Sequence, residues 1–118
     1  MSQFTIREGD TIFVRPGEQK TWAFDWNVLR PTVEVSDSEW DVAIVKQNGD
    51  AALTTDHDSI VTGDDELTDN RATRVMLIAT DALEGDLYTL TNTITTNESP
   101  AQVIIRSADV FVTTKPQR

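Results

Sequence analysis

Cysteine is absent from this chain, and histidine occurs only once, at His57. Without cysteine there can be no disulfide bond, no thiolate metal ligand and no cysteine nucleophile. Most zinc sites combine several histidine and cysteine ligands, so a single histidine excludes them as well. The composition therefore gives no support to a disulfide-stapled domain or to a zinc enzyme.

Long hydrophobic runs are also missing. The longest, at residues 75–79, is far shorter than the roughly 20 apolar residues that a membrane-spanning helix needs. The N-terminal stretch MSQFTIREGD lacks the basic and apolar segments of a signal peptide. We therefore expect synthesis in a cytoplasm and no contact with membranes.

Positive charge is scarce. The sequence contains ten lysine and arginine residues and twenty acidic residues, which gives a net charge of −10. Such a chain repels nucleic-acid phosphates, so we expect no direct contact with DNA or RNA. Between Glu34 and Asp69 the only basic residue is Lys46. We interpret this region first as a solvated acidic surface, with a face for a basic partner as the alternative. Its candidate contact residues are Asp56, Asp58, Asp64, Asp65, Glu66 and Asp69.

Strand patterns dominate the rest of the chain, and no window shows helical spacing of its apolar residues. Trp22, Phe24 and Trp26 alternate with smaller or polar residues, which predicts that they share one face of a strand. The predicted strands are residues 3–7, 11–15, 20–29, 32–35, 39–46, 59–61, 71–80, 86–96 and 101–114, the last with a break near RSAD (residues 106–109). The turn QNG predicts a hairpin over residues 40–55, and residues 56–70 otherwise read as an acidic loop.

Seven to nine short strands in 118 residues predict an all-β, immunoglobulin-like antiparallel β-sandwich. We assign residues 1–114 to this single domain and residues 115–118 to a C-terminal tail. No cofactor is expected.

The stretch TDALEGDLYTLTNTITT predicts the corner of such a sandwich. In immunoglobulin-like folds a tyrosine near the start of one strand hydrogen-bonds to backbone a few residues upstream. Here a loop with Asp81 and Gly85 precedes Tyr88, the only tyrosine, and Leu90 stands where antibody domains place a cysteine. Asn92 shares the face of Tyr88 and needs buried partners, whereas Trp22, Trp26 or Trp40 would supply the large core aromatic.

The acidic residues and His57 raise two chemical alternatives, a calcium site and a catalytic site. Counted from Asp56 as the first position of an EF-hand, the sixth residue is Val61 and the twelfth is Leu67, so the motif fails. An irregular calcium site among the loop carboxylates stays open as an alternative. His57 has no nucleophile motif around it, and no carboxylate pair stands out by its spacing. We therefore predict that the chain is not an enzyme.

Three blocks carry a family resemblance: WAFDWNVL, GDLYTLTNTITT and AQVIIRSADVFV. They resemble the small immunoglobulin-like structural proteins of tailed bacteriophages and prophages. The residues behind the resemblance are Phe24, Asp25, Trp26, Gly85, Tyr88, Leu90, Asn92, Ile94, Thr96, Arg106, Ser107, Val110 and Val112.

The resemblance implies a virion component, made in the host cytoplasm, such as a capsid decoration, a head–tail junction part or a tail or fibre accessory. It would bind other capsid, neck or tail proteins and form a homo-oligomer in the particle. Two alternatives remain: an immunoglobulin-like module that binds carbohydrate or a cell-surface protein, and an assembly chaperone absent from the finished particle. Exposed tryptophans would favour the carbohydrate module.

Overall fold

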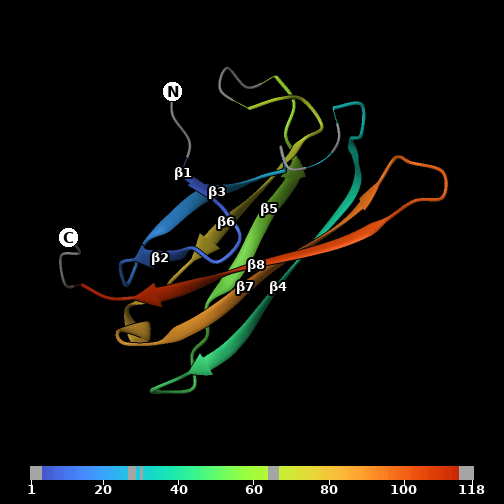
Figure 1. The fold of residues 1–118 in the computed structure, drawn as a ribbon. Helices are drawn as coiled ribbons and strands as arrows, with labels where there is room; N and C mark the ends of the chain where they lie inside the picture. The colour runs from blue at the N-terminus through green and yellow to red at the C-terminus, as the bar shows by residue number, and fades with distance from the viewer. Residues whose placement is uncertain (1–3, 27–28, 30, 64–66, 115–118) are drawn as a thin grey trace.

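The structure is a computed structural model that describes residues 4–26, 29, 31–63 and 67–114. These residues form eight strands and one short 3-10 helix, and the strands make up two four-stranded sheets (Figure 1). The all-β prediction is confirmed. Among the described residues, no helix is both long and apolar enough to cross a membrane.

The first sheet has the strand order β1-β3-β6-β5. Its members are β1 (Phe4–Ile6), β3 (Gln19–Asp25), β6 (Ala72–Ile78) and β5 (Thr54–Ile60). The second sheet has the order β2-β8-β7-β4. Its members are β2 (Thr11–Val14), β8 (Val103–Val112), β7 (Leu87–Thr96) and β4 (Val35–Lys46). The helix η1 (Asp81–Leu83) lies between β6 and β7 in the chain.

Both sheets are mixed, which corrects the expectation of purely antiparallel pairing. β1 pairs with β3 in parallel, and β2 pairs with β8 in parallel, whereas the other pairs are antiparallel. Parallel neighbours need a long connection between them. The chain provides it because β1 and β2 belong to different sheets, so β1 reaches β3 only after the chain has passed through β2.

Two further predictions about residues 40–60 are wrong. β4 pairs with β7 and β5 pairs with β6, so residues 40–55 connect the two sheets and do not form a hairpin. Asp56, His57 and Asp58 lie within β5 and not in a loop. A register shift in the pairing with β6 falls at this point, and His57 has a positive φ of 53°.

The predicted strand at 32–35 is wrong except for its last residue, because β4 begins at Val35, and the predicted strand at 39–46 starts four residues earlier than expected. A register shift between Val35 and Asp37 absorbs the irregular sequence, and the Ser36 hydroxyl there donates to the carbonyls of Thr95 and Thr96 at 3.1 and 3.2 Å. The predicted break at RSAD is also wrong, since β8 continues through it. What changes at that point is the pairing, because β2 joins β8 only from Asp109 onwards.

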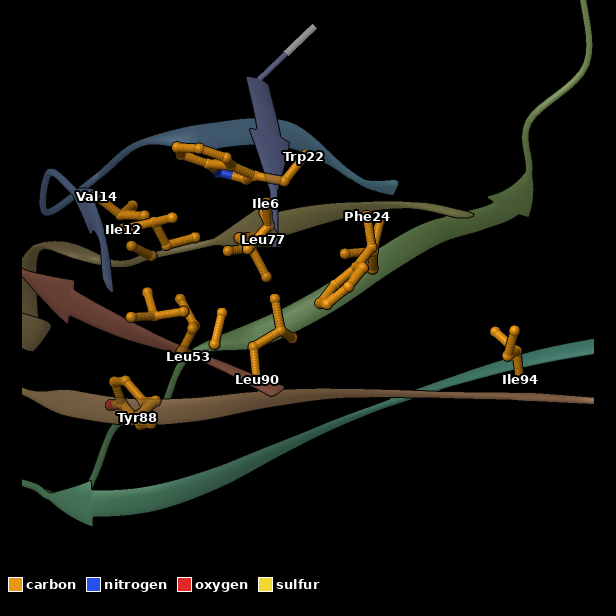
Figure 2. Packing of buried hydrophobic residues seen from close by; sticks show 14 of the residues in the cluster. Ile6, Ile12, Val14, Trp22, Phe24, Leu53, Leu77, Tyr88, Leu90 and Ile94 are labelled. Atoms are coloured by element: carbon orange, nitrogen blue, oxygen red, sulfur yellow. The ribbon is translucent and has the colours of Figure 1, made fainter. Parts of the chain in front are cut away.

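The core lies between the two sheets. Along β7 buried and half-buried side chains alternate without exception, so Tyr88, Leu90, Asn92 and Ile94 face inward. Figure 2 shows Phe24 and Leu77 of the first sheet opposite Tyr88 and Leu90 of the second. Each fully buried side chain of this size stabilises the fold by about 1.5–3 kcal/mol. The sandwich interior is thus filled, and contacts with other molecules are left to edges and outer faces.

Candidate interaction surface

The outer face of the second sheet carries a row of threonines. Thr89, Thr91, Thr93 and Thr95 of β7 are half-buried and point away from the core. In the register of the sheet, Thr93 lies between Glu39 of β4 and Ile105 of β8. The row therefore separates an acidic strand from an apolar one, and the outer face changes character across its width.

Exposed apolar side chains gather on this same sheet. In the described part of the chain, the large apolar residues that are exposed are Phe13 on β2, Ile44 and Val45 on β4, and Val103 and Ile105 on β8. None of them belongs to the first sheet. Isolated exposed apolar residues are ordinary on a protein surface, but their restriction to one sheet makes that sheet the better candidate for protein contacts.

The acidic residues gather where β4 and β5, the last strands of their respective sheets, run along the same side of the sandwich (Figure 1). Their carboxylates are exposed, and the residues concerned are Asp37, Glu39 and Asp41 on β4 and Asp56 and Asp58 on β5. An open hollow of about 410 Å³ lies beside them. Its lining residues are Ser38, Glu39, Trp40, Asp41, Asp58 and Thr93.

The chemistry of this hollow favours a cation. Glu39, Asp41 and Asp58 supply negative charge, and the half-buried Trp40 adds an aromatic ring. No three acidic or histidine side chains in the described ranges lie close enough together to hold a metal ion.

The remaining predicted acidic residues are not brought together with these. Asp69 is exposed and accepts a hydrogen bond from the backbone NH of Gly63 at 2.8 Å. Asp64, Asp65 and Glu66 lie outside the described residues. The irregular calcium site in this loop thus stays an open alternative.

Tyr88 is fully buried, but its hydroxyl group does not make the bond that we expected. It donates to the side-chain carboxylate of Asp86 at 2.6 Å, and the backbone hydrogen bond that it makes is with Leu53, far upstream in the sequence. Burial, with the hydrogen bond to Asp86 as the next cause, raises the pKa of Tyr88 to about 12. The phenol therefore stays protonated and serves a structural purpose.

Asp86 is the corner residue that the sequence analysis missed. It is fully buried, and its other carboxylate oxygen accepts from the backbone NH of Asn48 at 2.9 Å. Its backbone carbonyl accepts from the backbone NH of Val112. Asp86 therefore connects the start of β7 to β8 and to the segment between β4 and β5. A signal was available, because Asp86 and Tyr88 are two residues apart and so point to the same side of an extended chain.

Gly85 and Asp81 occupy the corner as predicted but differ in their roles. Gly85 adopts a φ of +87°, and its NH donates to the carbonyl of Val112 at 2.7 Å. Asp81 is exposed at the start of η1. Gly85 thus shapes the turn, whereas Asp81 only begins it.

Asn92 is the centre of a buried polar network that joins the sheets. Its side-chain oxygen accepts from the indole NH of Trp26 at 2.9 Å and from the hydroxyl of Thr73. Its NH2 group donates to the Ser38 hydroxyl and the Glu39 carbonyl, both at 2.9 Å. All of its polar capacity is used inside the protein, so Asn92 holds the structure together and has nothing left for a ligand.

The three tryptophans differ in their exposure. Trp26 is fully buried and stacks on Phe24 with ring centroids 5.2 Å apart, and Trp22 is also buried. Trp40 is half-buried, with its ring centroid 6.5 Å from that of Phe24. Leu90 is buried between the sheets as expected.

Comparison with known proteins does not identify a family. A scan against protein-family models finds no match to this chain, and a search of curated proteins finds none either. Function must therefore be argued from the geometry described above.

Proposed function

We propose that this chain is an immunoglobulin-like, non-catalytic structural protein of a tailed-bacteriophage particle, held there by protein–protein contacts. The sequence blocks around Trp26, Tyr88 and Val110 supply the link to phage proteins. The interaction surface of the second sheet supplies the means of attachment.

The strand order supports the immunoglobulin-like assignment. In chain order the strands correspond to A, A′, B, C, D, E, F and G, which gives the sheets A-B-E-D and A′-G-F-C. Immunoglobulin domains divide their strands in the same way, with A, B, E and D on one sheet and C, F and G on the other. Tyr88 near the start of β7 and Trp40 on β4 also match positions of that fold. The parallel β1–β3 pair and the Tyr88–Asp86 bond are departures from it.

The observation that carries the function is the placement of exposed apolar side chains on the second sheet alone. A protein that works by adhesion needs a surface with apolar area and directional charge. The second sheet offers both, with Val103 and Ile105 at one side and Asp37, Glu39 and Asp41 at the other. In a particle with many copies, individually weak contacts add up through avidity.

The carbohydrate-binding alternative loses most of its support. Sugar sites present exposed aromatic faces, but Trp22 and Trp26 are buried, and only the half-buried Trp40 borders the open hollow. The assembly-chaperone alternative differs from the virion proposal only in whether the protein remains in the finished particle.

Mass spectrometry of density-purified particles tests the proposal. Particles from the phage or induced prophage that encodes the chain should contain it in a fixed ratio to the major capsid or tail proteins. The ratio should survive repeated gradient purification. Recovery from the lysate but not from the particles would overturn the virion role and favour the chaperone.

A further inference from the structure

One half of β8 is an open sheet edge. β8 pairs with β7 along residues 103–111, but β2 covers its other side only from Asp109 to Val112. At Ser107 the gap is closed by Glu8 and Gly9, since the Glu8 carboxylate accepts from the Ser107 NH and the Gly9 NH donates to the Ser107 carbonyl. On this other side, residues 103–106 have no strand of the described chain beside them (Figure 1).

The backbone of this segment presents free hydrogen-bonding groups. The backbone groups of Ser107 and Asp109 form hydrogen bonds on the side of β8 where β2 lies. Because every second residue of a strand directs its NH and carbonyl to the same side, those of Val103 and Ile105 point to the open edge. In the described part of the chain, the backbone NH groups of Val103 and Ile105 have no hydrogen-bond acceptor on this open side of β8. The Ile105 carbonyl is occupied by the guanidinium of Arg106 at 2.9 Å, which partly blocks the edge. An arginine in this position is a device that restrains edge-to-edge pairing.

Apolar side chains flank these free groups. Val103 is 65% exposed and Ile105 is 56% exposed, and among the large apolar residues of the described chain only Val45, at 58%, lies between them. Both point to the outer face of the second sheet. The segment thus combines the backbone and the side chains that a further β-strand would use.

The distribution of charge indicates where two copies of the chain could approach each other. The net charge of −10 makes copies of the chain repel one another, and β4 and β5, the other sheet edges nearby, carry exposed carboxylates. Residues 103–106 contain no carboxylate and one cation, Arg106. Charge therefore opposes self-association less at this segment than along β4 or β5.

We infer that a second copy of the chain pairs with this edge, β8 against β8, antiparallel about a twofold axis at Ile104. Val103 of each copy then lies opposite Ile105 of the other, and Ile104 lies opposite Ile104. A twofold axis at Ile105 would need Ser107, whose NH is already taken by Glu8. A twofold axis at Val103 would put Ile105 opposite Ala101, which lies outside β8. Only the register centred on Ile104 uses the open residues alone.

The β8–β8 contact is expected to be weak in a free dimer and to gain strength when many copies assemble in a particle. The new strand pair forms few hydrogen bonds, and the Arg106 guanidinium must leave the Ile105 carbonyl for all of them to form. The two Arg106 residues would stand about 13 Å apart along the strands, beyond a Debye length of about 8 Å at physiological salt. The contact adds a self-association step to the proposed function and shares with it the premise that the chain acts by protein contacts.

Disulfide trapping tests this contact, because the chain has no cysteine of its own. Ile104 and its counterpart form a non-hydrogen-bonded pair with Cα atoms about 4.5 Å apart, within the range of a disulfide. The variant Ile104→Cys should therefore give a covalent dimer under mild oxidation. Val103→Cys tests the register, since its Cα atoms would be about 8 Å apart and should react much more slowly. Ile44→Cys, on β4 at the opposite edge of the same sheet, measures random collision.

Charge variants in the Ile104→Cys background complete the test. Ile105→Lys should abolish the dimer, whereas Val45→Lys, equally exposed on β4, should leave its yield unchanged. Arg106→Ala should raise the yield, because it frees the Ile105 carbonyl. A folded Ile104→Cys variant that stays monomeric, or that reacts no faster than Ile44→Cys, would overturn the inference. Absence of the chain from purified particles would overturn the virion role and leave this result unaffected.

Discussion

The buried network around Asn92 gives the sharpest prediction for stability. In the variant Asn92→Ala, the indole NH of Trp26 and the hydroxyl of Thr73 both lose their shared acceptor, and the Glu39 carbonyl loses a donor. A buried group left without its partner costs about 1–3 kcal/mol, and the cavity adds to this. Because the Trp26 NH keeps a 3.2 Å contact with Thr73, we expect a total loss of about 3–4 kcal/mol in the free energy of unfolding.

Urea denaturation followed by tryptophan fluorescence measures this loss. The midpoint should fall while the slope of the transition is unchanged, since the surface exposed on unfolding is the same. The matched control is Thr93→Val, one residue away on the outward face, which should change the stability by no more than about 0.5 kcal/mol. A loss below about 1 kcal/mol for Asn92→Ala, or an equal loss for the control, would refute the view that this network joins the sheets.

Two other predictions concern the corner. Tyr88 should titrate with a pKa of about 12 in the folded protein, and close to the ordinary 10.0 in denaturant. Because the folded pKa is the higher one, the stability from this group is intact below pH 10 and is lost as the pH rises toward 12. Phenolate absorbance reports it alone, since there is one tyrosine, and a native midpoint near 10 would contradict the buried bond to Asp86. Gly85→Ala should cost about 1–3 kcal/mol, because φ is +87° and the new Cβ would lie 2.7 Å from the Asn48 side chain. Gly49→Ala, with no neighbour within 4 Å, should cost far less, and equal thermal shifts for the two variants would count against this account.

Local alternation was enough to predict most strands, and the limits of the prediction have physical causes. β7 alternates because one of its faces is buried along its whole length, so its pattern is visible in the sequence. The prediction of a hairpin over residues 40–55 was wrong because the sequence QNG is compatible both with a turn between two paired strands and with a turn that leads to the other sheet. The partner of β4 is β7, some fifty residues away, and a local pattern carries no information about it.

The candidate surface was harder to foresee than the fold. In β8 the run VIIR is apolar without alternation, yet Val103 and Ile105 are exposed because they point to the outer face of the sheet and β2 does not extend along residues 103–106. The length of one strand relative to its neighbour is a property of the assembled sheet. Trp40, in contrast, was identified from the sequence, but only the structure brings it beside Asp58 in one hollow.

The central claim is that this protein acts through the β2-β8-β7-β4 sheet. Hydrogen exchange tests it most directly, by comparing the isolated chain with the chain bound in its particle. The account predicts added protection along β8 at residues 103–106 and along β4, with little change in β1, β3 and β6. Protection confined to the β1-β3-β6-β5 sheet, or no protection in either sheet, would contradict it.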